Sequence, residues 1–229
     1  MKILGIDTTT KFLCLGVYDN GRIYEYNLDV GRKLSALITP AIKRVVDALG
    51  WQIKDIDYFA CGLGPGSFTG IRVGIAAIKG LALSLNKPVV GIPTLDILAA
   101  NARTAGNYVM PIVDARRNLI YCGIYRNKSG KLTRITPYML LTIDEFFKKI
   151  KVKGDVVMLG DAVNLYKQKI LMRMGKATVL DKDYWYPAGH NIVNLAIDRI
   201  KAEKTDSAFG IKPVYLYPKE CQIKNIRKI

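Results

Sequence analysis

The 229-residue sequence contains one histidine and four cysteines, and this scarcity excludes several classes of protein. A single imidazole, His190, cannot form a His-x-x-x-His metal motif, and no nucleophile–base pair stands beside it. The cysteines are scattered without a Cys-x-x-Cys pair, so they predict neither a disulfide framework nor a zinc site. We therefore expect no metal site, no catalytic residue and a reducing environment.

Long hydrophobic runs are also missing. The richest stretch, Ile71 to Leu85, is interrupted by Arg72 and Lys79, and it falls short of the ~18–20 apolar residues that span a membrane. The apolar N-terminus is broken at Asp7 and is too short for a signal peptide. The sequence therefore predicts a soluble, cytoplasmic protein without a membrane segment.

Acidic residues are scarce relative to basic ones. The chain has 19 Asp and Glu against 35 Lys and Arg, a net charge of +16, while half of its residues are hydrophobic, which excludes a disordered basic tail. Residues 1–105 carry 12 basic and 8 acidic side chains, whereas residues 106–229 carry 23 and 11. This excess favours a phosphate-rich partner such as nucleic acid, although a merely Lys-rich surface would show the same balance.

Strands and helices alternate along the chain in a way that is typical of an α/β fold. The first half predicts strands at 2–7, 11–18, 22–29, 57–63 and 88–92, and helices at about 34–49, 70–85 and 94–103. The run from Asp19 to Gly21 predicts a tight hairpin, because Asn-Gly tolerates positive φ. Pro40 predicts either a kink in the first helix or a helix that starts there with Thr39 as its N-cap.

Residues 108–136 repeat the opening of the chain at a constant offset. Three landmarks keep the same spacing in both copies: Asp7 and Asp114, Gly16 and Gly123, and Tyr18 and Tyr125. Each copy continues with a glycine-containing turn and a third strand. We interpret the repeat as an internal duplication that builds two similar lobes, an N-terminal lobe at 1–105 and a basic C-terminal lobe at 106–229. The second lobe is expected to continue with a helix at about 142–150, a strand at 155–160, and helices at 162–174 and 190–203.

Each copy places an aspartate at a strand end before a tight turn, and the two turns would face each other across a cleft. Backbone N–H groups in such turns can hold phosphates, and the two carboxylates can hold Mg²⁺ through water. The arrangement resembles the actin, Hsp70 and sugar-kinase superfamily and implies its duplicated, ribonuclease H-like α/β fold. The alternative is that both aspartates only cap turns. A glycine-rich adenosine loop late in the chain is not recognisable.

A glycine-rich loop at 62–70, Gly-Leu-Gly-Pro-Gly-Ser-Phe-Thr-Gly, joins a strand to a helix N-terminus, where Ser67 or Thr69 would be the cap. It is not a Walker loop, because no Gly-Lys-Ser/Thr follows. Exposed N–H groups there would favour an anion, whereas the glycines would equally let two backbones approach. The candidate nucleotide-binding residues are Asp7, Thr8, Thr9, Gly64, Gly66, Ser67 and Asp114.

This loop, the opening Ile-Asp-Thr-Thr, the Gly-Ile-Pro-Thr at 91–94 and the Val-Asp-Ala-Arg at 113–116 together resemble the TsaB (YeaZ) family of glycoprotease-like proteins. The resemblance is clear over about residues 1–125. It implies a non-catalytic relative, dimerisation partner and activator of TsaD, the transferase that, with the ATPase TsaE, places threonylcarbamoyl on N6 of adenosine 37 in tRNAs reading ANN codons. TsaD carries its metal on a His-x-x-x-His motif, which a chain with one histidine cannot supply.

The resemblance further implies a heterodimer with TsaD, a homodimer when the chain is alone, and contact with tRNA through the complex. It implies no cofactor for the chain alone, with ATP or ADP and Mg²⁺ left open for the complex. Two rival functions are considered. A free-standing ATPase or phosphotransferase needs an adenosine loop and a catalytic carboxylate, and a protease needs a metal motif or a nucleophile–base pair. Neither set is evident in the sequence.

The helix that follows Gly70 is apolar on nearly every side, so the lobe's own sheet can cover only one of its faces. Neighbouring helices or a partner chain would cover the other. Together with the first helix, this apolar helix is predicted to form a two-helix surface that binds either TsaD or a second copy of the chain. Its candidate residues are Leu34, Ile38, Ile42, Val45, Ile71, Arg72, Ile75, Ile78 and Ala82. One departure is that Leu34-Ser35-Ala36 stands where the family usually has His-Ser-Glu.

Contact with tRNA is expected in the basic second half. The candidate residues are Arg116, Arg117, Lys224, Arg227 and Lys228. The run Tyr184-Trp185-Tyr186 would serve either as a stacking platform for a base or, as such clusters more often do, as packing for a loop.

Overall fold

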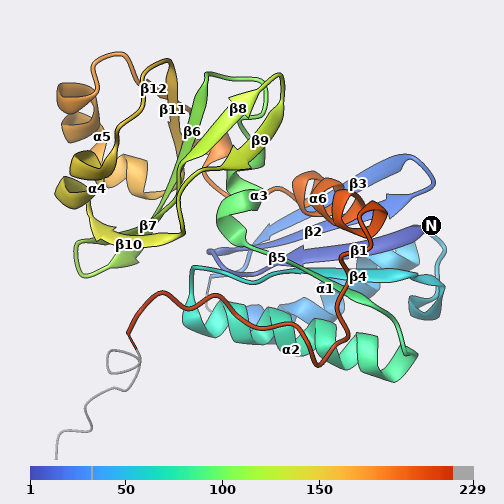
Figure 1. Cartoon of the computed structure of the whole chain (residues 1–229). Coiled ribbons are helices and arrows are strands. Elements are labelled where there is room, and N and C mark those ends of the chain that lie inside the picture. Colours follow the sequence, from blue (N-terminus) through green and yellow to red (C-terminus); the bar gives the residue numbers. More distant parts are fainter. Residues whose placement is uncertain (32, 219–229) are drawn as a thin grey trace, which may run out of the picture.

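The computed structural model describes residues 1–31 and 33–218, and two mixed β-sheets flanked by helices lie next to each other in it (Figure 1). The strands of the first sheet are β1 (Lys2–Asp7), β2 (Phe12–Asp19), β3 (Arg22–Asp29), β4 (Tyr58–Gly62) and β5 (Val89–Ile92). Those of the second are β6 (Tyr108–Arg116), β7 (Leu119–Cys122), β8 (Tyr125–Lys128), β9 (Lys131–Arg134), β10 (Met139–Thr142), β11 (Val156–Leu159) and β12 (Thr178–Val179). The helices are α1 (Leu34–Ala48), α2 (Phe68–Leu85), α3 (Thr94–Ala100), α4 (Ile143–Lys149), α5 (Ala162–Arg173) and α6 (Gly189–Lys201), with short 3-10 turns η1 (Ile53–Asp55) and η2 (Lys182–Tyr184).

The first sheet has the strand order β3-β2-β1-β4-β5. β1 pairs in parallel with β4 and antiparallel with β2, so three antiparallel strands open the lobe as the sequence predicts. The predicted hairpin between β2 and β3 is confirmed, because Asn20 and Gly21 both adopt positive φ. β1 is buried from Ile3 to Asp7, as expected for a central strand with helices on both faces.

The second sheet repeats this plan with interruptions. Its main path is β10-β7-β6-β11-β12, and each neighbouring pair has the same parallel or antiparallel sense as its counterpart in the first sheet. β7 and β8 both pair with β6, and β9 continues beside β8. The second and third strands of the repeat are therefore each broken in two, at residues 123–124 and 135–138. The duplicated two-lobe fold predicted from the repeat is confirmed.

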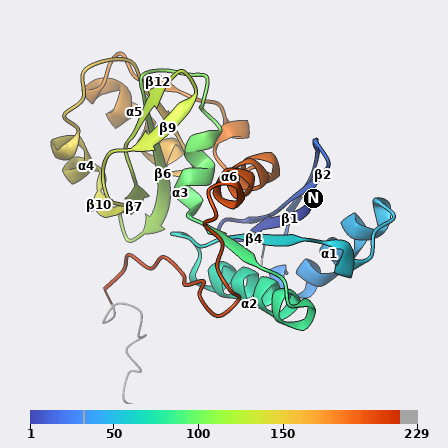
Figure 2. The same cartoon turned by 45° about the vertical axis from the view of Figure 1, so that its right-hand side comes forward.

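The helices that follow each sheet in sequence are exchanged between the lobes (Figures 1 and 2). α3 follows β5 but packs on β6, whereas α6 follows β12 but packs on β1, β2 and β3. Ile192 and Ala196 of α6 are buried against Ile3 of the first sheet. Beyond α6, Asp206 bridges to Val89 of β5. The single boundary near residue 105 therefore needs correction, because a sheet needs cover on both faces and residues 189–217 supply it to the first lobe.

This exchange also changes the distribution of charge. Residues 106–188, which hold the second sheet, carry 15 Lys and Arg against 7 Asp and Glu. The described residues that follow, 189–218, carry 4 against 3; α6 lies on the first sheet, and Tyr217 near the end of the segment reaches the second lobe. The second lobe is still the more basic one, but the contrast is smaller than a division at residue 105 predicts.

The first helix runs through its proline. α1 begins at Leu34 and contains Pro40, so a start at Thr39 is wrong. Thr39 and Pro40 lie on the exposed face, opposite the buried residues Ile38 and Ile42.

Candidate functional site

The first aspartate turn is closed within the protein. Asp7 is completely buried, and its Oδ1 accepts hydrogen bonds from the backbone N–H (2.8 Å) and the hydroxyl (2.7 Å) of Thr9. Its Oδ2 accepts the hydroxyl of Thr94 at 2.9 Å, which ties the turn to the start of α3. Burial raises the pKa of Asp7, and these hydrogen bonds oppose the rise. The carboxyl group is thus fully engaged.

The glycine-rich loop packs directly on this turn. A Cβ atom on Gly62 would overlap the carboxylate of Asp7, and one on Gly70 or Gly74 would overlap polar atoms of Thr8. The backbone N–H of Ser67 donates to the carbonyl of Thr9 at 2.7 Å. The glycines are therefore needed for close approach of two backbones, which is one of the two alternatives that the sequence left open.

The residues predicted to bind a nucleotide in the first lobe lie together, but Asp7, Thr8 and Thr9 face inward and only Ser67 is exposed. Thr8 and Thr9 are 1% and 2% exposed, and the Thr8 hydroxyl donates to the carbonyl of Gly70 at 2.7 Å. The Ser67 hydroxyl accepts the N–H of Gly70 at 3.2 Å and is the N-cap of α2. This burial argues against a nucleotide role for Asp7, Thr8 and Thr9 and favours a structural one.

Replacing Gly70 by Ala is expected to lower the free energy of unfolding by about 1–3 kcal/mol, because the new methyl group must displace the Thr8 backbone. The matched control is Gly80→Ala on the same helix, where a Cβ meets nothing within 4 Å. That control is expected to leave stability unchanged or raise it by up to about 1 kcal/mol. Thermal unfolding of both variants measures the difference, and equal midpoints would contradict the packing argument.

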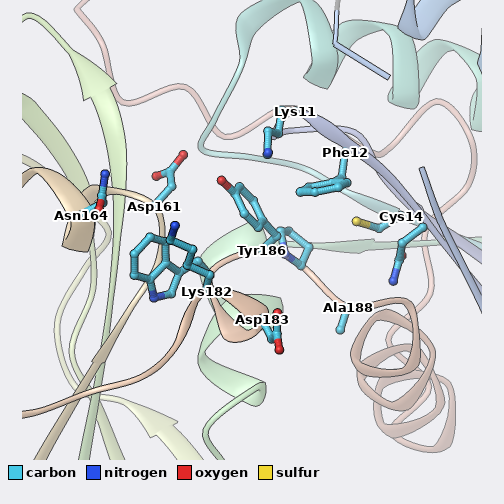
Figure 3. Close-up of a pocket in the computed structure, with 12 residues that line it drawn as sticks. Lys11, Phe12, Cys14, Asp161, Asn164, Lys182, Asp183, Tyr186 and Ala188 are labelled. Carbon is cyan, nitrogen blue, oxygen red and sulfur yellow. The ribbon is translucent and has the colours of Figure 1, made fainter. Parts of the chain in front are cut away.

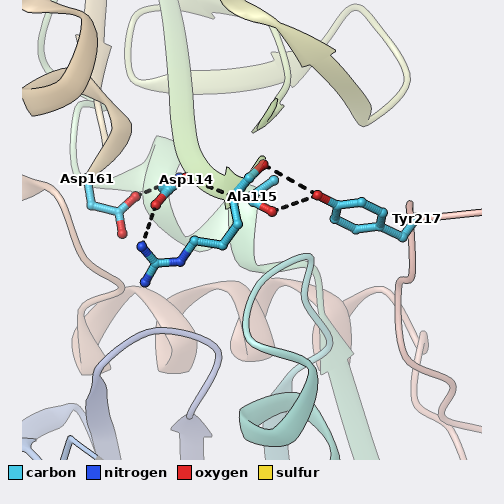
Figure 4. Close-up of polar contacts among 5 residues, drawn as sticks. Asp114, Ala115, Asp161 and Tyr217 are labelled. Atoms are coloured by element: carbon cyan, nitrogen blue, oxygen red, sulfur yellow. Dashed lines mark hydrogen bonds and ion pairs between the residues drawn. The ribbon is translucent and has the colours of Figure 1, made fainter. Parts of the chain in front are cut away.

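The second aspartate turn is more open (Figure 4). Asp161, at the N-terminus of α5, accepts the backbone N–H of Asp114 at 2.8 Å. Asp114 accepts the backbone N–H of Arg116 at 2.8 Å and pairs with its guanidinium at 3.0 Å. The Tyr217 hydroxyl donates to the carbonyl of Ala115 at 2.8 Å. The turn therefore presents arginine side chains rather than free N–H groups toward the lobe boundary.

A cavity of about 550 Å³ lies in the cleft between the lobes (Figure 3). Lys11, just before β2, is paired with Asp29 at 3.2 Å, and its Nζ lies 4.7 Å and 5.3 Å from the ring centroids of Phe12 and Tyr186. Asp161 enters from the other side, and burial raises its pKa. Basic and acidic groups alternate around this cavity, so its charge does not select a cation or an anion.

Metal ligands do not gather in this cleft. Across residues 1–31 and 33–218, no group of three His, Cys, Asp or Glu side chains is placed to hold a metal ion. Trp185 is 8% exposed and donates its indole N–H to the carbonyl of Leu180 at 2.8 Å, so this member of the aromatic run packs its loop.

A second cavity, of about 290 Å³, lies between the glycine-rich loop, the β6–β7 turn and the segment after α6. Its lining residues are Gly66, Phe68, Ile71, Ala115, Arg116, Arg117, Tyr121, Val214, Leu216, Tyr215 and Tyr217. Its charged lining residues are the two arginines alone, and both are exposed. This cavity is therefore the positively charged one of the two.

Polar contacts hold α3 against the second sheet. Asp96 of α3 accepts the hydroxyls of Tyr125 and Tyr138 from the second sheet, each at 2.7 Å. Burial is the main cause that raises the pKa of both tyrosines, and the Asp96 charge adds to it. Asn101 donates to the carbonyls of residues 184 and 186. The side-chain amide of Asn191 on α6, which packs on the first sheet, donates to Asn101 at 2.7 Å, so opening of the lobes would have to break this bond.

Most residues predicted for the partner interface face the protein's own core instead. Leu34, Ile38, Ile42, Ile71, Ile75, Ile78 and Ala82 are all buried in the cluster beneath the first sheet. Val45 is half-buried, and Arg72 alone is exposed. The prediction that these buried side chains contact a partner is therefore wrong, because α1 and α2 turn their largest apolar residues toward β1, β2 and β4.

The outward face of α2 is nevertheless mostly apolar. It consists of Thr69, Arg72, Val73, Ala76, Lys79, Gly80 and Leu83, with Phe68 at the helix start, so its charges are those of Arg72 and Lys79; we call these residues the α2 face. Leu83 and Phe68 are 48% and 40% exposed. α2 is also the one described helix long and apolar enough to cross a membrane by composition, although its inner face is buried against the sheet. The unpartnered apolar side that the sequence predicted exists, but different residues form it.

The single histidine has a structural position. The backbone N–H of His190 donates to Glu25, and Nδ1 of His190 lies 2.7 Å from the same carboxylate oxygen. This contact joins the start of α6 to β3. The Glu25 hydrogen bond raises the pKa of His190, and the same bond lowers the pKa of Glu25.

This pair predicts a pH-dependent contribution to stability. The raised pKa means that the His190 contribution is present below pH 6.5 and is lost as pH rises through the folded-state value. The lowered pKa means that the Glu25 contribution is present above pH 4.5 and is lost on acidification. Glu25→Gln should therefore cost more near pH 5.5 than near pH 8.5, by less than about 1 kcal/mol because the pair is half-exposed. Urea unfolding at both pH values tests this, and an equal loss would contradict it.

The duplicated sheets, the exchanged helices and the facing aspartate turns define a protein of the two-lobe actin-like ATPase fold class. A family model for TsaD, the tRNA N6-adenosine threonylcarbamoyltransferase, matches residues 29–210. The tRNA threonylcarbamoyladenosine biosynthesis protein TsaB of Bacillus subtilis is 33% identical over 172 residues, which cover 74% of this chain and 75% of that protein. The Escherichia coli TsaB is 27% identical over 223 residues, covering 94% of each chain.

Solved structures agree with these relatives. YeaZ from Pseudomonas aeruginosa is 25% identical with a TM-score of 0.80, covering 94% of this chain and 99% of that one. A second crystal structure, of a protein described as similar to the peptidase YeaZ, gives a TM-score of 0.82 at 25% identity over the same shares. The chain belongs to the TsaB family, which lies within the broader group related to TsaD.

The sequence missed three features of the site: the α2 face, the cavity at the β6–β7 turn and the role of residues 205–217. Gly80 gave the only local signal for the first, as a glycine inside an apolar helix. The predicted tRNA contacts Lys224, Arg227 and Lys228 lie outside the described residues.

Proposed function

We propose that this chain is a non-catalytic, cytoplasmic subunit needed for threonylcarbamoylation of N6 of adenosine 37 in tRNAs that read ANN codons. It acts as the dimerisation partner and activator of TsaD and works together with TsaE. Membership of the TsaB family supports the assignment of the chain to tRNA threonylcarbamoyladenosine biosynthesis. The observation that carries the partner role is the exposed, mostly apolar α2 face, on which Gly80 has no neighbour within the chain.

Gly80 is not explained by the packing of this chain. A Cβ atom at this position would meet nothing within 4 Å. Glycine inside a helix costs about 1 kcal/mol relative to alanine, so a glycine without a local reason favours an external one. Ala76 lies one turn earlier, and two small residues at this spacing let a second helix approach closely. A partner helix crossing α2 at Gly80 supplies that reason.

The α2 face is the proposed surface for both assemblies. In the complex TsaD would cover it, and in the isolated chain a second copy would cover it as a homodimer. Exposed Leu83 and Phe68 give the face apolar anchors, and Arg72 stacks on Phe68 with its guanidinium carbon 3.7 Å from the ring centroid. Such a mixture of aromatic, aliphatic and arginine side chains is typical of the centres of protein interfaces.

An independent ATPase or phosphotransferase is disfavoured by the first turn. A catalytic or Mg²⁺-binding carboxylate must reach its ligand, whereas Asp7 is completely buried with both oxygens engaged. Nucleotide needed by the assembled machinery would then be handled by TsaD and TsaE.

Contact with tRNA is proposed for the second lobe. Arg116 and Arg117 are exposed at the β6–β7 turn, on the lobe with the larger basic excess. Guanidinium groups contribute to RNA affinity mainly by releasing counterions from phosphates.

The experiment combines binding and hydrolysis measurements on the purified chain. Co-elution with the cognate TsaD at one-to-one stoichiometry, and ATP hydrolysis no faster than the buffer control, are the expected results. ATP turnover by the chain alone would favour the free-standing ATPase instead, and failure to co-elute with TsaD would contradict the partner role.

A further inference from the structure

The cavity beside the β6–β7 turn is built from three distant parts of the chain. The N-terminus of α2 forms one wall, the β6–β7 turn a second, and residues 214–217 a third. The backbone N–H of Val214 donates to the carbonyl of Leu63 at 2.8 Å, and the Tyr217 hydroxyl donates to Ala115 (Figure 4). Both lobes therefore hold the segment that closes the cavity.

Aromatic rings line this cavity on both sides. Phe68 and Tyr215 stack in a tilted arrangement with ring centroids 5.4 Å apart, and Tyr121 meets Tyr217 edge-on at 6.2 Å. Tyr121 is buried, with 7% of its surface exposed, and this burial raises its pKa to about 12. Nε of Arg72 donates to the Tyr215 hydroxyl at 3.2 Å. The rings offer flat surfaces of the kind on which unpaired bases stack.

The two arginines at the rim occupy a backbone conformation that disfavours them. Arg116, Arg117 and Asn118 have φ values of +66°, +52° and +59°. Two successive residues with positive φ form a tight hairpin turn in which Asn-Gly is preferred, and asparagine fits while arginine is strained. Arg117 is exposed and makes no ion pair with any described residue. Strain of this kind is concentrated at functional sites.

We propose that this cavity binds one unpaired nucleotide of an RNA strand, with the base on the aromatic rings and the adjoining phosphates on Arg116 and Arg117. The inference deepens the proposed function, on which it rests, by naming where the chain touches RNA. The larger cleft cavity is not suited to this role because acidic Asp161 and Asp183 line it beside Lys11 and Lys182. A free mononucleotide shares the same chemistry, and the experiment separates the two sources.

The probe is a fluorescent, unstructured 12-nucleotide oligoribonucleotide, and its binding to the purified chain is measured by anisotropy at several salt concentrations. Arg116→Gly with Arg117→Gly should weaken binding about tenfold or more and reduce the magnitude of the salt slope by about 1.4, because each phosphate contact on a single strand contributes about 0.7. The same double variant should keep or raise the thermal midpoint, because glycine accepts positive φ without strain.

The matched control is Lys128→Ala with Lys131→Ala, which removes two exposed positive charges from the β8–β9 hairpin. We expect this control to change affinity less than threefold. Equal weakening of both double variants would overturn the inference, because binding would then follow net charge and not the cavity.

The aromatic half of the inference is tested by photo-crosslinking. The same oligonucleotide carrying 4-thiouridine should crosslink to Phe68, Tyr121, Tyr215 or Tyr217, and Phe68→Leu should reduce both yield and affinity. Crosslinks confined to other regions would overturn the inference. ATP that binds the cavity as tightly as the oligonucleotide would overturn assignment to an RNA strand.

Failure here is separable from failure of the proposed function. If the oligonucleotide does not bind while tRNA modification still requires the chain, only this inference is overturned. If modification proceeds without the chain, the proposed function itself is overturned.

Discussion

Replacing Gly80 by Leu is expected to abolish co-elution with TsaD, and homodimerisation of the isolated chain, without lowering its stability. A leucine there points away from the sheet, where a Cβ meets nothing within 4 Å. Leucine is a better helix former than glycine by several tenths of a kcal/mol. A closely packed partner helix, by contrast, would be pushed away, and we expect affinity to fall about a hundredfold or more. Calorimetric titration with TsaD and a thermal melt of the variant alone measure both effects.

The control adds the same side chain elsewhere. Gln168→Leu places a leucine on the exposed surface of α5 in the second lobe, and it should leave TsaD binding unchanged. A second variant, Leu83→Asp, puts a charge on the α2 face itself and should weaken binding as Gly80→Leu does. Binding that survives both substitutions on the α2 face would show that the partner docks elsewhere.

Replacing Ile75 and Ile78 together by Asp is expected to unfold the chain. Ile75 is 8% exposed and Ile78 is fully buried in the core beneath the first sheet. Removing a buried isoleucine costs about 2–5 kcal/mol, and burying a carboxylate without a partner adds to this. The sum reaches the whole stability of a typical domain, about 5–15 kcal/mol. Loss of the cooperative thermal transition, followed by circular dichroism, is the expected result.

Ile75 and Gly80 distinguish the buried face of α2 from its open face. Ile75 and Gly80 lie on one helix, but one side chain builds the core and the other site is open. A folded Ile75→Asp, Ile78→Asp double variant with a wild-type melting midpoint would contradict the assignment of this helix face to the core. It would also restore these isoleucines as interface residues.

The internal duplication is the feature of the fold that the sequence predicted best. The alignment of Asp7 with Asp114 predicted two similar sheets, and their pairing confirms it, because repeated local patterns fold into repeated local structures. The sequence analysis did not predict the interruptions at residues 123–124 and 135–138, although Pro137, which cannot donate to a sheet, lies in the second of them.

The errors concern contacts between distant segments. Periodicity predicted α2 as a helix with two apolar sides, but not that the isoleucines would face the sheet while Ala76, Gly80 and Leu83 are exposed. The spacing of Gly62, Gly66 and Gly70 was visible, whereas the turn that they pack against lies more than fifty residues earlier. The packing of α6 on the first sheet likewise depends on which face of that sheet the preceding helices leave exposed. A local sequence pattern does not contain this information.

The central claim is that this chain supports threonylcarbamoylation as a partner without chemistry of its own. Reconstitution with cognate TsaD, TsaE, threonylcarbamoyl-adenylate and an ANN-reading tRNA tests it most directly, with modified adenosine 37 measured by mass spectrometry. We predict modification with the wild-type chain, and loss of modification when the chain is omitted or replaced by Gly80→Leu. Undiminished modification without the chain would contradict the account.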